Sequence, residues 1–400
     1  MSAERLYYDQ PYLRRFEARV TSSGPRQDKY AVNLDKTAFY PTSGGQPNDL
    51  GTIGDAAVVD VLEEDHEVVH ITDRAPSREA VECNVDWTRR FDMMQQHTGQ
   101  HILSAAFEKI CDADTVGFHL SEHSLTIDLN MGALEAGVLR QVEEMANQVV
   151  FESRCVSSVW PDDAGLRGMP LRKPPARAEG IRVVVVEGLD YSPCGGTHVS
   201  STGQVGIVKV LGWEKVRSGI RIPFACGWRA LKDYGQKNET VAEISAILSA
   251  PSAELDRAVR RLVEQNLAYG KRIESMGKEL VEYEAQSLAR TGGDVVARCY
   301  ASKELPHLRL LASLIASCGG RVAVLGSETP SPQVIVARSD DVNVDARQLI
   351  EVAKSVLGGK GGGNPKLAQA GCQDASLIAP AVQAAGKAAR DAIQAGRGVG

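Results

Sequence analysis

The sequence predicts a multidomain protein of the α+β class, with a β-rich N-terminal region, a mixed α/β core, a long helical linker and an α/β C-terminal domain. Three observations support this. Short β-branched runs fill the first ninety positions, helical periodicity then alternates with strands, and a heptad pattern precedes a last set of strands and helices. The expected domains are residues 1–90, 91–230, 231–292 and 293–400.

Bulk composition limits the class of protein. The 400 residues are 43% hydrophobic, which is enough for several domains with their own cores. The N-terminus lacks the apolar segment of a signal peptide, and no stretch approaches the length of a membrane span, so we expect a cytoplasmic protein without membrane contact. Eight scattered cysteines without a CxxC pair suit a reducing compartment. The net charge of −6 gives no general attraction to nucleic acid, so an RNA partner would need a local basic patch.

The N-terminal region is expected to consist of strands joined by turns. A dense turn segment, TAFYPTSGGQPNDLG, occupies residues 37–51. The runs that predict strands are KYAVNLD, AAVVDVL and HEVVHITD.

The core is expected to alternate helices and strands. Residues 91–111 and 133–152 have helical periodicity, and a Pro-rich basic connector covers residues 171–180. The predicted strands are GFHLSEHSLTIDLN as a pair or a bent strand, the apolar IRVVVVEGL, GIVKVLGWEKV and GIRIPFACG.

From about residue 228 helix dominates, and a heptad pattern follows a possible N-cap at Ser252. It ends at Gly292 and Gly293, and its positions are Leu255, Val259, Leu262, Asn266, Tyr269, Ile273, Met276, Leu280, Tyr283 and Ser287. Two interpretations stay open. The stripe is either a coiled-coil seam that pairs two chains, with Asn266 fixing the register, or the buried face of a helix packed on its own protein.

The last hundred residues predict a separate α/β unit. Strands are expected in RVAVLGS and QVIVARS, and helices over residues 345–357 and 375–395. The stretch GGKGGGNPK between those helices lacks the order of a P-loop. We expect its glycines to form a nest of backbone N–H groups that contacts phosphate with Lys360 and Lys366.

Two histidines four positions apart, His97 and His101, lie in the predicted helix 91–111 and would project from one face. The same spacing in His66/His70 and His119/His123 falls in predicted strands, where the pairs would be about 13 Å apart and could not share a metal.

A second pair, Cys194 and His198, lies in the glycine-rich CGGTH segment after a buried strand. One thiolate and three imidazoles suit zinc better than calcium or magnesium. A closed zinc that only stabilises the fold is the structural alternative, and an open position would allow chemistry. The HExxH arrangement of metalloproteases is absent, because Thr98, Gly99 and Gln100 separate the two histidines.

Taken together, the motifs resemble a known family. HTGQHILSAAF, TVGFHL, TIDL and CGGTHV resemble the editing domain of alanyl-tRNA synthetase and its free-standing AlaX relatives. TAFYPTSGGQPNDLG is similar to the family's N-terminal β-barrel motif, and GGKGGGNPKLAQAG to the C-terminal domain of the long AlaX form. The resemblance covers nearly the whole chain in the family's order. The related threonyl enzyme has a Cys-x-Gly-Pro-His form, so the alanine branch is favoured.

The resemblance implies a trans-editing hydrolase: an aminoacyl-tRNA deacylase that removes serine, or glycine, from tRNA(Ala) independently of ATP. The barrel begins within the first twenty residues, which leaves no room for an aminoacylation domain. An editing site separate from the aminoacylation site is needed because a pocket for alanine discriminates poorly against serine and glycine. Hydrophobic selection over one methylene gives only about 1–3 kcal/mol.

The resemblance also implies roles for particular residues. Thr37 matches the family threonine that hydrogen-bonds the serine side chain, and Gln46 of SGGQ would position the ester or the terminal ribose. Zinc held by His97, His101, Cys194 and His198 would activate water, polarise the ester or anchor the terminal adenosine. The C-terminal domain would grip the outer corner of tRNA or mediate dimerisation.

Other functions remain to be compared. A zinc-stabilised tRNA-binding protein without hydrolytic activity predicts a sealed metal and no cavity beside Thr37. A phosphodiesterase needs Asp-His-His metal motifs, which the sequence lacks. A third alternative keeps the deacylase but changes the amino acid or the tRNA.

Overall fold

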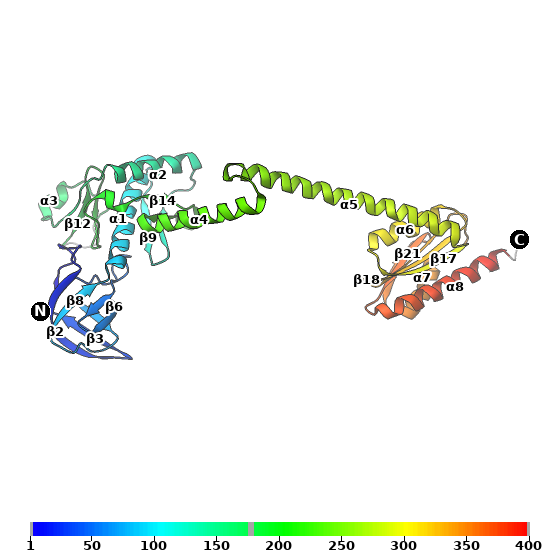
Figure 1. Cartoon of the computed structure of the whole chain (residues 1–400), viewed down its shortest axis with the longest axis horizontal. Helices are drawn as coiled ribbons and strands as arrows, with labels where there is room; N and C mark the ends of the chain where they lie inside the picture. Colours follow the sequence, from blue (N-terminus) through cyan, green and yellow to red (C-terminus); the bar gives the residue numbers. More distant parts are fainter. Residues whose placement is uncertain (1–2, 175–179, 398–400) are drawn as a thin grey trace. The chain divides into compact units, whose positions relative to one another are not determined.

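A computed structural model describes residues 3–174 and 180–397, and it divides into two compact units, Met1–Ile244 and Ser245–Gly400. The mixed α+β architecture with several domains agrees with the expectation (Figure 1). Within the described residues, we find no helix with the length and apolar character needed to cross a membrane.

The N-terminal region forms a closed six-stranded barrel, which confirms the prediction of a barrel. Apolar side chains on alternate positions fill its interior, among them Phe16, Val32, Leu34 and Val61. Its strands, in barrel order, are β2 Arg15–Arg26, β3 Lys29–Leu34, β7 Glu67–Thr72, β6 Ala56–Glu64, β5 Gly51–Ile53 and β8 Ala80–Val85. A two-residue strand β1, Glu4–Arg5, pairs with β4, Lys36–Thr37.

The core of unit 1 is organised around helix α1, Trp87–Cys111. It starts four residues earlier than expected because the Asp86 side chain accepts a hydrogen bond from the backbone N–H of Arg89. One sheet contains β9 Thr115–Leu120, β10 Leu125–Leu129, β14 Val208–Val210, β15 Glu214–Val216 and β16 Gly219–Cys226. A smaller sheet contains β11 Val156–Val159, β12 Val183–Val186 and β13 Asp190–Pro193. Helices α2 Ala136–Phe151 and α3 Asp163–Gly168 complete it.

The two other HxxxH segments are only partly strand. His66 is the last residue of the turn before β7, and His123 lies in the reversal between β9 and β10. The strand pair expected over GFHLSEHSLTIDLN is therefore present, and each of the two histidine pairs has one member outside a strand. Part of the predicted connector, residues 175–179, lies outside the described residues.

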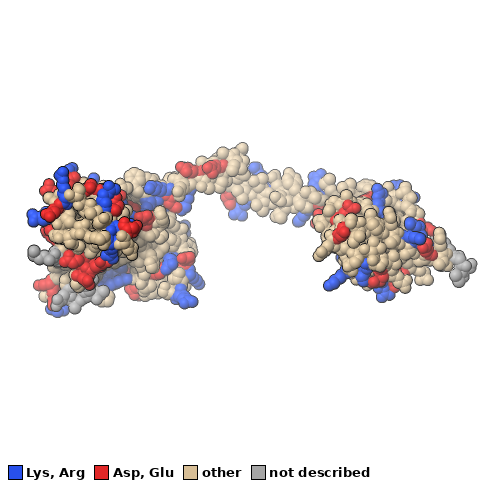
Figure 2. Space-filling model, turned by 90° about the horizontal axis from the view of Figure 1, so that it is seen from below, with Lys and Arg blue, Asp and Glu red and all other residues tan. Residues whose placement is uncertain are grey.

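Two long helices follow, α4 Gly227–Leu248 and α5 Leu255–Thr291. Ser252 begins a short 3-10 turn rather than capping α5, which starts after Glu254. The C-terminal end of α5 buries Val281, Ala285 and Leu288 in unit 2. The buried face of α5 differs from the heptad stripe, whose residues Ile273, Leu280 and Tyr283 have exposed fractions of 70%, 67% and 71%. The stripe is therefore not the face that packs on this chain. Uncharged residues occupy much of the visible surface of α5 (Figure 2).

Unit 2 is a mixed five-stranded sheet with helices on both faces. Helix α6, Leu305–Ser317, and the end of α5 cover one face, and α7, Ala346–Leu357, and α8, Ile378–Arg397, cover the other. The strand order is β17 Val295–Ser302, β18 Val322–Thr329, β19 Gln333–Arg338, β21 Leu367–Gly371 and β20 Lys360–Gly363.

The predicted glycine nest is wrong. Lys360–Gly363 is an edge strand whose backbone pairs with β21, so its N–H groups do not converge on one point. The glycines are needed for close approach instead, since a Cβ at Gly361 or Gly363 would lie 2.4 or 2.3 Å from a carbonyl oxygen of β21.

Candidate metal centre

Helix α1 presents two imidazoles on one face. His97 and His101 are four residues apart in an unbroken helix, and their ring centroids lie 5.4 Å apart. Both are buried, and strands β9, β10, β13 and β16 contact α1.

The turn after β13 brings the second pair to this face. The Arg182 guanidinium donates to the carbonyl oxygens of Cys194 and Gly196, at 3.1 and 2.8 Å, and so fixes the turn. A Cβ at Gly196 would lie 2.2 Å from Cε1 of His97. Glycine is therefore required here for close packing against His97, and no positive φ angle is involved.

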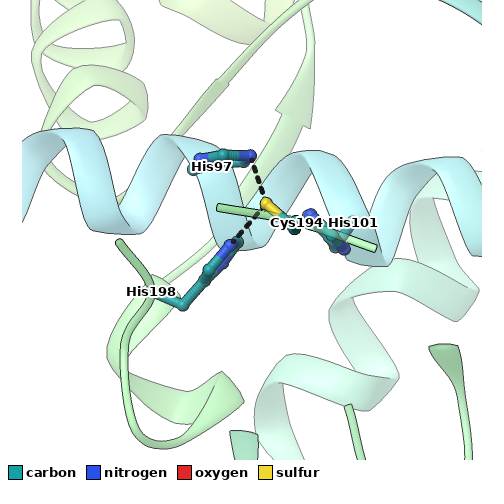
Figure 3. A group of neighbouring side chains, drawn as sticks. All are labelled: His97, His101, Cys194 and His198. Carbon is teal, nitrogen blue, oxygen red and sulfur yellow. Dashed lines mark hydrogen bonds between the residues drawn. The ribbon is translucent and has the colours of Figure 1, made fainter. Parts of the chain in front are cut away.

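The four predicted ligands form one cluster (Figure 3). One ligand atom from each of His97, His101, Cys194 and His198 lies within 4.8 Å of every other, and within the described residues no further group of three or more such side chains was found. The Cys194 Sγ is 3.4 Å from Nε2 of His97 and 3.3 Å from Nε2 of His198. Ligands of tetrahedral zinc are separated by about 3.3–3.6 Å, so the donor set and its spacing fit this metal.

Each histidine is oriented through its other ring nitrogen. The Nδ1 of His97 is 2.8 Å from Gln46 Oε1, and that of His101 is 2.8 Å from Asp190 Oδ2. Amide and carboxylate oxygens only accept hydrogen bonds, so both Nδ1 atoms carry a proton and Nε2 is the nitrogen of each ring that is left to bind a metal. The Nδ1 of His198 is 3.1 Å from the Thr98 hydroxyl.

Asp190 and Arg172 extend this arrangement, and the sequence analysis missed both. Arg172 Nε donates to Asp190 Oδ1 at 2.7 Å, and the Ser192 hydroxyl also donates to the carboxylate. Burial favours the neutral acid, but His101 and Arg172 outweigh it and lower the pKa of Asp190 to about 2. The available signal was an acidic residue in the strand four positions before Cys194.

The electrostatics favour a thiolate at the centre. Burial opposes ionisation of Cys194, but the surrounding imidazoles outweigh it and hold its pKa well below the usual value of 9.0. Burial also opposes the charged form of His101, yet Asp190 and Cys194 raise its pKa to about 9. A metal that binds here therefore displaces a proton from His101.

A cavity of about 250 Å³ opens onto the cluster. Its polar lining includes Gln100, Thr115 and Ser192, and Gly44 of the SGGQ turn also contributes. The cluster is consequently accessible from one side, as a reaction site requires.

Gln46 and Thr37 do not line this cavity. Gln46 is buried behind His97, where its Oε1 also accepts from the Thr197 backbone and its Nε2 donates to the Thr197 hydroxyl. Thr37 lies in the barrel, where its hydroxyl contacts Nε2 of His70 at 2.8 Å and accepts from the Phe39 N–H. Burial lowers the pKa of His70 to about 4, so its ring is neutral and Nε2 accepts the Thr37 proton.

The two predicted lysines are in unit 2. Both are exposed; Lys360 is on the edge strand β20, and the Nζ of Lys366 forms an ion pair with Asp340 at 2.7 Å.

Comparison with known proteins supports the assignment of the fold. Residues 181–222 match the family model described as the threonyl and alanyl tRNA synthetase second additional domain, and residues 299–395 match the DHHA1 domain. The alanyl-tRNA editing protein AlaX-L of Pyrococcus horikoshii is 32% identical over 92% of this chain and 94% of its own length. The chain belongs to the AlaX-L family.

The AlaX-L family shares this region with larger enzymes. An alanine–tRNA ligase of Natronomonas pharaonis is 31% identical over 98% of this chain, which spans 44% of that enzyme. A crystal structure of the C-Ala domain from Aquifex aeolicus alanyl-tRNA synthetase matches 25% of this chain with 23% identity and a TM-score of 0.22.

Proposed function

We propose that this AlaX-L family member hydrolyses the ester of tRNA(Ala) mischarged with serine, or with glycine, and does not aminoacylate. The observation that carries the proposal is the four-ligand cluster with a cavity on one side. The opening at the cluster favours a hydrolase over a zinc-stabilised tRNA-binding protein with a sealed metal, although the cavity does not extend to Thr37. The P. horikoshii relative is named an alanyl-tRNA editing protein.

In the proposed reaction, water adds to the acyl carbon and the bond from that carbon to the ribose oxygen breaks. One proton of the water passes to the ribose oxygen, which leaves free amino acid and uncharged tRNA. His97, His101, Cys194 and His198 would hold a zinc ion, which when bound would supply electrostatic stabilisation of the negative charge that develops on the ester. Gln46 and Asp190 hold the imidazoles in the orientation that the site requires, so we assign Gln46 to positioning His97 rather than the ester.

The direct test uses tRNA(Ala) charged with serine, glycine or alanine. We expect the full chain to release serine or glycine much faster than alanine, and a chelator to abolish the release. Equal loss of all three esters, or activity that persists without metal, would contradict the proposal.

Thr37 is proposed to read the substrate hydroxyl, although its side chain is fully buried and lines neither cavity beside the cluster, so this role requires a local opening of the barrel. The proton of its own hydroxyl is used by His70, so only its remaining lone pair can accept a further hydrogen bond. In T37V this acceptor is lost, and we expect the ratio of serine to alanine release to fall roughly 10-fold or more. The buried His70 and Phe39 groups also lose a partner, which destabilises the fold by about 1–3 kcal/mol.

T37S is the matched control for this prediction, because it keeps the hydroxyl. An unchanged ratio in folded T37V would leave Thr37 with a structural role in the barrel alone.

We propose that the C-terminal unit contacts tRNA and that α5 pairs two chains. Exposed Lys360 and Lys366 are candidates for contact with the tRNA backbone. The exposed stripe of Val259, Ile273 and Leu280 supports pairing of two chains through α5. Light scattering of the full chain measures its molecular mass in solution, which pairing would double.

A further inference from the structure

A second cavity, of about 380 Å³, adjoins the one at the metal ligands. The two share four lining residues, so they meet at the thiolate. Those residues are Gly44, Lys173, Pro193 and Cys194. A ligand that extends from one cavity into the other would pass directly beside the cluster.

Aromatic rings form part of the wall of the second cavity. Tyr8 and Trp160 meet edge to face, with centroids 5.4 Å apart and planes at 85°. Half of the Trp160 side chain is exposed, so an indole face is open to a ligand. The Arg182 guanidinium lies 5.5 Å from the centroid of Tyr8. Open aromatic faces of this kind are platforms on which a nucleobase stacks.

Arg182 fixes the backbone around this cavity. Its terminal nitrogens donate to carbonyl oxygens of Cys194, Gly196 and Tyr8. Its Nε is buried and has no hydrogen-bond partner within the described residues. Because Nε is out of contact with solvent, Arg182 acts by holding the wall of the cavity beside Tyr8 and not by contacting a ligand.

Charged groups of both signs line this cavity. Arg5, Lys173 and Arg182 are cationic, and the Glu63 carboxylate pairs with Arg5 at 2.7 Å. That carboxylate can accept a hydrogen bond from the exocyclic amino group of a nucleobase.

We propose that the second cavity binds the adenine ring at the 3′ end of the charged tRNA, stacked on Trp160. The ribose ester then extends past Cys194 toward the imidazoles. This inference rests on the proposed function, since the ester is carried by the terminal adenosine.

Adenosine is the probe, and its binding to the full chain is measured by equilibrium dialysis. We expect W160A to weaken binding roughly 10-fold or more and W160F to keep most of it, because a phenyl face still stacks. The KM for Ser-tRNA(Ala) should rise by a similar factor with little change in kcat. W213A is the matched control, since Trp213 is 44% exposed in the same unit and lines neither cavity.

The outcomes separate the two proposals. Absence of saturable adenosine binding, equal binding of uridine, or an unaffected W160A protein overturns the adenine site, even if the ester is hydrolysed normally. Trp160-dependent binding of adenosine without any ester hydrolysis supports the site and overturns the proposed function.

Discussion

The C194A protein is expected to lose both its bound zinc and its deacylase activity. Cys194 supplies the only anionic ligand of the four, and its Sγ lies centrally between two imidazoles. Loss of the electrostatic stabilisation that the metal provides corresponds to about 4 kcal/mol, or roughly 1000-fold in rate. Metal analysis of the purified variant and a single-turnover assay with Ser-tRNA(Ala) measure the two effects.

C111A is the control for this experiment. Cys111 ends the same helix and belongs to no metal cluster among the described residues, so its variant should keep metal and activity. A metal-free C194A protein that still hydrolyses the ester would contradict the assignment of the site.

The D190N protein is expected to fold with a weakened metal site. The substitution removes the charge that holds the Nδ1 proton of His101, and it leaves Arg172 without its buried carboxylate partner. Loss of such a partner commonly reduces metal affinity 10- to 100-fold. Competition with a chelator measures the affinity, and a zinc titration should restore part of the activity.

D92N separates this effect from the general loss of an ion pair. Asp92 lies on α1 and is paired with Arg229, away from the four ligands. We expect D92N to bind zinc as the unmodified chain does. Equal zinc affinities of D190N and D92N would show that Asp190 does not orient the site.

The parts of this protein that the sequence predicted well are those that depend on local patterns. Helix α1 followed from its periodicity, and the barrel followed from the resemblance of one turn motif. The four candidate ligands could be named because two short spacings, HxxxH and CxxxH, carry the right donor atoms.

The parts that were missed depend on contacts between distant segments. No local pattern states that Gln46 reaches His97, or that Arg172 reaches Asp190. The glycine run at Lys360–Gly363 was misread for the same reason, because the need for glycine there is set by the neighbouring strand β21. The heptad pattern of α5 is visible in the sequence, but whether it pairs two chains depends on contacts with a second copy.

The hydrogen bonds of Gln46 have a consequence for how the protein can be dissected. The Gln46 amide joins His97 on α1 to the CGGTH turn. A fully buried ion pair between Arg90 and Asp49 connects the start of α1 to the turn segment 37–51, which also contains Gln46. A truncated chain that begins at the helix would lack both ties. We therefore expect the first ninety residues to unfold together with the rest of unit 1, so that heating melts barrel and metal site in one transition.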